Sequence, residues 1–245
     1  MHRQILEKIK NARHAVAFTG AGISTLSGIR DFRGKDGLGR ETDAEKMFDM
    51  DYFEQDPTFY YKTAGGFIYN ADAYPASIVH KTLSALEERG LLRAIITQNI
   101  DFLHQKGGGK NVIEVHGSPA VHYCLRCAGV RLGFEEAARI VKSGGYPRCP
   151  NCSRILKPAI TFYGEPLPAE AVRAAFEEAD KTDLMLVLGT SLTVRPAAGI
   201  PEAALRHGAD IIIVNNMPTP LDRFAVLKAD ELAPVFEGIM NLLSA

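Results

Sequence analysis

The stretch that decides the fold is HAVAFTGAGISTLSG, residues 14–28. An apolar strand at 14–18 leads directly into a Gly-Ala-Gly turn. Backbone amides of such a turn, placed at a helix N-terminus, can hold a pyrophosphate without side-chain charge, although small-residue turns also follow strands that bind nothing. The dinucleotide fingerprint Gly-x-Gly-x-x-Gly would put its third glycine at Thr25, whereas the next glycine is Gly28. The stretch therefore predicts a nucleotide site that differs from those of hydride-transferring enzymes.

The same strand-then-turn pattern recurs along the chain. Further apolar runs occupy 92–99, 111–117, 183–191 and 210–216. Helix-like segments occupy 2–12, 77–89, 168–181, 197–207 and 231–243. Apolar runs without polar alternation are typical of strands covered on both faces. The alternation of strand and helix predicts an α/β fold, a doubly wound parallel Rossmann-like sheet. Ligands bind beyond the carboxyl ends of such strands, so we expect TGAGIS, TQNID, VHG, LGTS and VNN to surround one crevice.

Length and composition narrow the class of protein. The 245 residues are enough for a main domain with a smaller insert, and the net charge of -1 does not favour nucleic acid as a main ligand. The apolar runs are too short to span a bilayer. The charged N-terminal stretch lacks the apolar segment of a signal peptide. We therefore expect a cytoplasmic protein that binds neither nucleic acid nor membrane.

Two segments interrupt the alternation and divide the chain into three parts. Residues 31–76 resemble a small helical module that begins with a cofactor loop, and residues 118–157 contain all four cysteines. The expected Rossmann-like domain then comprises 1–30, 77–117 and 158–245.

The cysteines form two pairs, each with a two-residue gap. They are Cys124, Cys127, Cys149 and Cys152. This spacing lets four thiolates surround one tetrahedral zinc ion, with no position left open for catalysis. A pair of redox dithiols is the alternative, but those usually sit at a helix start after a strand, whereas YCLRC and RCPNC have turn-like sequence. The pattern predicts a structural zinc site.

Polar residues at strand ends are the candidates for chemistry. Asp101 could bind a ligand or cap the following helix. His116 could be a general base or a structural histidine. The loop residues Asp31, Phe32 and Arg33 could contact a ligand or form an ordinary solvated loop. Beyond the last strands, Thr190, Ser191 and Asn215 could hydrogen-bond a ribose or an adenine, or serve only the turns.

Seven motifs in one order resemble the sirtuin family, the NAD-dependent protein lysine deacylases of prokaryotic type. They are GAGIS with GIRDFRG, TQNID, VHG, the paired CxxC knuckles, YGE, GTS and VN, between residues 14 and 216. The resemblance implies NAD as co-substrate, structural zinc, and an acyl-lysine protein or peptide as partner. It implies a smaller domain made of a zinc ribbon and the helical module.

The resemblance also implies a role for each matching residue. His116 would be the general base, with Asn99 as the second catalytic residue. The phosphates, riboses and nicotinamide would contact Gly20, Ala21, Gly22, Thr25, Asp31, Phe32, Arg33, Gln98, Asn99, Ile100 and Asp101. The adenosine side would contact Gly189, Thr190, Ser191, Asn215, Lys228 and Ala229. The substrate, added as a strand, would contact Phe162, Tyr163, Gly164, Glu165 and Val194.

The implied reaction transfers the acyl group from lysine to ADP-ribose and releases nicotinamide. Arg30, Tyr163 and Arg195 depart from the residues usual in the family and bear on loop behaviour and substrate preference. The segment 59–69 lacks the Tyr-x-x-Arg pair of members that accept acidic acyl groups, so acetyl or other uncharged groups are expected. A mono-ADP-ribosyltransferase with the same pocket, a zinc-ribbon nucleic-acid module and an NAD oxidoreductase are the alternatives.

Overall fold

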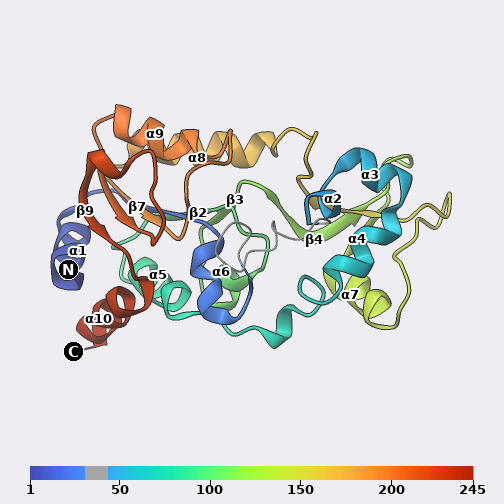
Figure 1. The fold of residues 1–245 in the computed structure, drawn as a ribbon, viewed down its shortest axis with the longest axis horizontal. Coiled ribbons are helices and arrows are strands. Elements are labelled where there is room, and N and C mark those ends of the chain that lie inside the picture. Colours follow the sequence, from blue (N-terminus) through green and yellow to red (C-terminus); the bar gives the residue numbers. More distant parts are fainter. Residues whose placement is uncertain (31–43, 245) are drawn as a thin grey trace.

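Two lobes of unequal size make up the molecule (Figure 1). The computed structural model describes residues 1–30 and 44–244. The large lobe contains a six-stranded sheet with its helices, and the small lobe contains a three-stranded sheet and helices α2, α3, α4 and α7.

All strands of the large sheet run parallel, in the order β3-β2-β1-β7-β8-β9. Their bounds are β1 Ala15–Thr19, β2 Ala94–Thr97, β3 Val112–Glu114, β7 Leu184–Leu188, β8 Asp210–Val214 and β9 Ala225–Ala229. The strand order reverses between β1 and β7, and this switch point is where such sheets bind their ligands, beyond the carboxyl ends of the strands. The predicted doubly wound parallel sheet is confirmed.

Helices cover both faces of this sheet, which explains why its central strands lack polar alternation. All five residues of β1 are buried, and successive side chains point to opposite faces, Ala17 to one apolar core and Phe18 to the other. The first core is closed by α1 His2–Asn11, α5 Ile78–Glu88 and α10 Leu232–Ser244. The second is closed by α8 Ala169–Lys181 and α9 Gly199–Arg206, on the upper side in Figure 1.

Two details of the sheet differ from expectation. The edge strand β9 was not predicted, because Lys228 interrupts its short apolar run and its residues alternate between half-buried and exposed. The third expected strand is shorter than its apolar run, since β3 ends at Glu114. His116 therefore lies in the connection between β3 and β4, not within a strand.

The small lobe is built on an aromatic core. Its antiparallel sheet has the order β5-β4-β6. The elements are α2 Ala44–Met47, α3 Met50–Gln55, α4 Pro57–Ala64, β4 Gly117–Tyr123, β5 Arg131–Gly133, α7 Phe134–Lys142 and β6 Lys157–Ile160. Asp56 caps α4 by accepting the Thr58 N–H, and Pro57 occupies the first turn, where no N–H is needed. Tyr60, Tyr61 and Phe162 are among the large side chains buried between the helices and the sheet.

Short helical turns connect the main elements. They are α6 Leu103–Lys106 and the 3-10 turns η1 Ala21–Ile23, η2 Thr25–Ser27, η4 Ala71–Ala73 and η5 Asp222–Phe224. Among the residues described, no helix combines the length and apolar character that crossing a membrane requires.

We propose the division into three parts given above, with one changed boundary. Strand β6 pairs with β4, and Gly117 is the first residue of β4. The proposed zinc-binding part therefore runs from residue 117 to residue 160 instead of from 118 to 157.

Candidate active site

A cavity of about 400 Å³ opens beyond the carboxyl ends of β1, β2, β7 and β8 and reaches the small lobe. It brings together sixteen of the residues proposed from the sequence: Gly20, Ala21, Gly22, Gln98, Asn99, Ile100, His116, Phe162, Tyr163, Gly164, Glu165, Gly189, Thr190, Ser191, Val194 and Asn215. The expectation that the five strand-end motifs surround one crevice is confirmed.

Glycines permit two loops to cross at the floor of the cavity. A Cβ on Gly22 would lie 2.8 Å from the Cα of Gly189, and Gly189 itself has a φ of +59°. The N–H groups of Gly20 and Gly22 donate to the carbonyl oxygens of Leu188 and Gly189, at 3.0 and 2.9 Å. These two amides are already bonded within the protein, so neither is free to hold a pyrophosphate in the way that the turn motif allows. The turn also leads into the 3-10 turn η1 instead of an α-helix.

A hydrogen-bonded network lies behind this turn. The Asn99 amide donates to the Gly20 carbonyl oxygen and to Ser24 Oγ, both at 3.1 Å, and Ser24 Oγ donates to Asp101 Oδ2 at 2.6 Å. Gln98 Nε2 donates to Thr190 Oγ1 at 3.0 Å and ties the β2 end to the β7 end. The network fixes the orientation of Asn99 and Gln98 before any ligand binds.

Asp101 serves the network and the next helix together. Its Oδ1 accepts the Leu103 N–H at 2.9 Å, at the start of α6, and its Oδ2 accepts from Ser24. Burial raises the pKa of Asp101, while these two donors act in the opposite direction. Asp101 does not line the cavity among the residues described; one of its oxygens serves the start of α6, as the capping interpretation has it, and the other belongs to the network.

Three other proposed residues lie away from the cavity wall. Thr25 Oγ1 donates to the Gly22 carbonyl oxygen at 2.9 Å, and Lys228 pairs with Asp222 at 2.5 Å. The Ala229 carbonyl oxygen accepts the backbone N–H of Asn215 at 2.9 Å. Thr25 and Ala229 thus support residues of the wall. The candidates Asp31, Phe32 and Arg33 lie outside the described residues.

His116 has one ring nitrogen fixed and the other free for chemistry. Its Nδ1 lies 2.9 Å from the Gln98 carbonyl oxygen. A carbonyl oxygen only accepts, so Nδ1 carries the proton and Nε2 of the neutral ring holds the lone pair. Burial lowers the pKa of His116 below its ordinary value of 6.5, partly offset by the bond to Gln98. The ring is therefore neutral near pH 7 and oriented to accept a proton at Nε2, as a general base does.

The segment from Phe162 to Glu165 forms the wall toward the small lobe. Phe162 is 1% exposed, whereas Tyr163 is 48% exposed. The Tyr163 N–H donates to the Phe48 carbonyl oxygen at 2.6 Å, and its carbonyl oxygen accepts the Met50 N–H at 3.1 Å. The backbone of Tyr163 is thus bonded to the helical module, and the expected strand pairing of a substrate with this residue is wrong.

Eight further residues of the wall were given no contact role from the sequence, although Asn216 belongs to the VNN motif and Arg195 was noted for substrate preference: Phe48, Ile160, Thr161, Leu167, Arg195, Pro196, Asn216 and Met217. Most of them flank one of the motifs, so extending each motif by two residues would have found them. Phe48 carries no such signal, because its place depends on how the helical module packs against β6.

The four cysteines form a second site within the small lobe. Their sulfur atoms all lie within 4.8 Å of one another, and those of Cys124 and Cys152 are 3.6 Å apart. Zinc–sulfur bonds of about 2.3 Å in a tetrahedron put the sulfurs about 3.8 Å apart, so the geometry fits zinc. The Cys127 N–H also points to Cys124 Sγ at 3.3 Å. Four protein ligands leave no open position, which makes the site structural.

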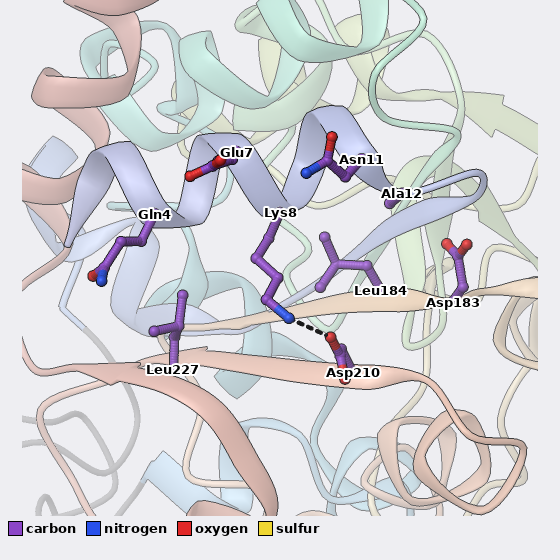
Figure 2. A pocket seen from close by; sticks show the side chains of 9 residues that line it. All are labelled: Gln4, Glu7, Lys8, Asn11, Ala12, Asp183, Leu184, Asp210 and Leu227. Carbon is purple, nitrogen blue, oxygen red and sulfur yellow. Dashed lines mark hydrogen bonds and ion pairs between the residues drawn. The ribbon is translucent and has the colours of Figure 1, made fainter.

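Another cavity, of about 450 Å³, lies near the amino ends of strands of the large sheet, away from the carboxyl ends that line the first cavity (Figure 2). Helix α1 and the amino ends of β7 and β8 line it. Its most prominent contact is an ion pair between Lys8 and Asp210 at 2.8 Å, with both side chains close to half exposed. None of the motif residues lines it.

Comparison with known proteins identifies relatives along nearly the whole chain. The chain is 41% identical to an NAD-dependent protein deacetylase of Thermotoga maritima over 92% of this chain and 91% of that protein. It is 40% identical to an NAD-dependent protein deacylase of Thermococcus kodakarensis over 92% and 90%.

Solved structures agree in fold. A Sir2 structure with a p53 peptide and NAD+ matches with a TM-score of 0.87 and 38% identity, over 100% of this chain and 98% of that one. A Sir2 variant with a deacetylated p53 peptide and 3'-O-acetyl ADP-ribose matches with a TM-score of 0.89 and 38% identity, over 99% and 97%. The model of the Sir2 family matches residues 20–196. The chain therefore belongs to the Sir2 family.

Proposed function

We propose that this protein is an NAD-dependent protein lysine deacetylase or deacylase, which moves the acyl group of a lysine to ADP-ribose and releases nicotinamide. The observation that carries the proposal is the neutral His116 ring in a cavity that joins the glycine crossing to an apolar wall. The names of the relatives and the peptide, NAD+ and acetyl-ADP-ribose bound in the solved Sir2 structures support it.

The proposed cofactor contacts follow the lining of the cavity. NAD supplies the reactive ribose carbon, with nicotinamide as its leaving group. Ala21 and Gly22 would lie beside the phosphates, Asn99 and Ile100 beside the nicotinamide, and Asn215 beside the adenosine. Because Ser24 and Gly20 already fix the Asn99 amide, this side chain would meet its ligand without reorganising.

His116 would accept a proton from a ribose hydroxyl at Nε2. The Gln98 carbonyl oxygen holds the ring in the required tautomer and would stabilise the charge that develops on the ring after proton transfer. Within the described ranges 1–30 and 44–244, the ring is thus held ready near pH 7 by a carbonyl oxygen and not by a carboxylate.

The acyl-lysine would enter between the lobes. Phe48, Ile160, Phe162 and Leu167 provide an apolar wall, which suits acetyl and other uncharged acyl groups better than acidic ones. A substrate backbone would run between Gly164 and Val194, since Tyr163 already pairs with the helical module.

We further propose a cytoplasmic location. The four cysteines converge on one tetrahedral site and are not paired in disulfides. Thiolate zinc sites of this kind persist where thiols are kept reduced, as in the cytoplasm.

A peptide panel tests the function. The purified protein is incubated with NAD and peptides that carry different acyl-lysines, and the products are identified by mass spectrometry. We expect deacylated peptide together with acylated ADP-ribose, and a loss of about 10²- to 10⁴-fold in turnover for His116→Ala. NAD binding, measured by calorimetry, should persist in that variant.

His207→Ala is the matched control, because His207 is half exposed and pairs with Asp180 at the surface. Its turnover should equal that of the unchanged protein. ADP-ribosylated protein without deacylated peptide would replace the proposal with a mono-ADP-ribosyltransferase, and near-normal turnover in His116→Ala would remove His116 from the mechanism.

A further inference from the structure

Lys157 is a fully buried lysine directly beneath the apolar wall. It is 0% exposed, although lysine is rarely buried without a partner. Its Nζ lies 2.8 Å from Glu165 Oε2 and donates to the Ile160 carbonyl oxygen at 2.7 Å. Both partners belong to the segment that lines the cavity. The ammonium group is thus directed at the wall and not at solvent.

The Glu165 carboxylate connects this ammonium to the backbone of the wall. The same Oε2 accepts the Phe162 N–H at 2.8 Å, and the Glu165 N–H donates back to the Phe162 carbonyl oxygen at 3.0 Å. Glu165 therefore closes the turn from Phe162 to Glu165 twice, once through its carboxylate and once through its backbone N–H. Its carboxylate is held in turn by Lys157.

Lys157 also contacts the aromatic ring of Phe162. Its Nζ lies 4.0 Å from the ring centroid, within the range of a cation–π interaction. The ring has edge contacts with Phe48 and Phe53, with centroids at 5.6 and 5.4 Å. Phe162 is thus held by the ammonium and by neighbouring rings, and it lines the cavity in this fixed position.

An ion pair alone would not require burial, as the pair between Lys8 and Asp210 demonstrates (Figure 2). That pair has the same N···O distance of 2.8 Å and remains close to half exposed. Burying an ammonium costs desolvation free energy, which only a well-placed counter-charge and further hydrogen bonds offset. At Lys157, the two shortest polar contacts, to Glu165 and to the Ile160 carbonyl oxygen, lead to the apolar wall, and a third goes to the Pro158 carbonyl oxygen at 3.3 Å.

We propose that Lys157 is a positioning residue that sets the acyl-binding wall through Glu165 and the ring of Phe162. The inference rests on the proposed function, because the wall is defined by the acyl group that it would contact. Lys157 touches no reacting atom in this scheme, and its effect belongs to substrate binding and not to the chemical step.

Lys157→Met tests the inference, with Lys8→Met as the matched control. We expect kcat/KM for an acetyl-lysine peptide to fall about tenfold or more in Lys157→Met, through a higher peptide KM at nearly unchanged kcat. The KM for NAD should stay as in the unchanged protein. Lys8→Met should leave kcat, the peptide KM and the KM for NAD unchanged.

A double variant separates positioning from stability. Lys157→Met leaves the charge of Glu165, whose side chain is 20% exposed, without its cation, whereas Lys157→Met with Glu165→Gln removes that charge and keeps an acceptor for the Phe162 N–H. The double variant should recover the melting temperature but keep the raised peptide KM, because Phe162 still lacks its ammonium contact. If Lys157→Met does not fold, the peptide KM of the double variant still tests the inference.

Recovery of both the melting temperature and the peptide KM in the double variant would overturn the inference, as would a peptide KM in Lys157→Met equal to that of the unchanged protein. In either case turnover by the unchanged protein would still support the proposed function. No turnover by the unchanged protein would reject the proposed function and this inference with it.

Discussion

At the floor of the cavity, the glycines that let two loops pack closely also line the proposed binding site. Gly189 approaches the turn after β1 so closely that a Cβ would lie 2.5 Å from the Ile23 nitrogen. Real Cβ atoms do not approach a backbone nitrogen so closely, so the two loops would have to separate. The crossing requires glycine for space as well as for its φ of +59°.

We expect Gly189→Ala to destabilise the protein by about 1 kcal/mol or more beyond the cost of its positive φ. Gly90→Ala is the control, because Gly90 has a φ of +68° and a Cβ added there would meet no heavy atom within 4 Å. Urea unfolding of both variants measures the difference. Equal losses would show that the crossing can relax, and NAD binding should weaken only in Gly189→Ala.

Among the elements, the zinc knuckles anchor the strand that ends in the substrate wall. Cys149 and Cys152 precede β6, Cys124 follows β4, and these two strands pair with each other. The chain passes directly from β6 into Thr161 and Phe162. The metal site therefore holds the wall in place from a distance, through one pair of strands.

Cys124→Ala should lose zinc and unfold the knuckles, because metal binding supplies much of the folding free energy of such small sites. Metal analysis and limited proteolysis check this, and we expect cleavage within the cysteine-containing segment together with loss of turnover. Arg126→Ala changes an exposed side chain between two ligands and should behave as the unchanged protein. Full activity of metal-free protein would contradict the structural role.

On the scale of the whole molecule, stability depends on buried neutral histidines. His80 and His122 are 0% exposed, and burial lowers the pKa of each from 6.5 to about 4. His80 Nδ1 accepts the Ser77 N–H at 3.1 Å at the start of α5, so its protonation would break this cap. Below pH 6.5 the unfolded chain binds protons that the folded chain does not. Stability is therefore lost as the pH falls toward about 4.

For each of these histidines the loss between about pH 7 and about pH 5 is about 2 kcal/mol. His80→Gln keeps an acceptor at the cap and does not titrate. The free energy of unfolding of the unchanged protein should therefore fall by about 2 kcal/mol more than that of His80→Gln over this interval, as measured by urea unfolding. Parallel pH curves for the two proteins would contradict the assignment.

The large lobe was predictable from sequence because each central strand is buried on both faces and ends in a polar motif. β1, β2, β7 and β8 follow the apolar runs of the sequence closely. The edge strand β9 was not predictable in this way, because an edge strand needs no continuous apolar run.

The small lobe and the details of the wall depend on contacts between distant segments. The bonding of Tyr163 to Phe48 joins segments far apart in the sequence, and the burial of Lys157 beneath Phe162, a few residues later, follows from no apolar pattern of that segment. Likewise, the backbone hydrogen bonds at the glycine crossing occupy the Gly20 and Gly22 amides, which the motif alone could not show. The sequence therefore predicts which residues meet at the cavity better than it predicts what each of them bonds to.

His116 stands at the joint between the two lobes. Gly117, the next residue, begins β4, and a Cβ there would collide with the Ala159 carbonyl oxygen of β6. The His116 carbonyl oxygen accepts the Thr161 N–H at 2.8 Å, one residue before Phe162. A rotation of the small lobe would therefore reach the imidazole through a single peptide unit. If the lobes close on a substrate, the same movement would carry the proton acceptor with it.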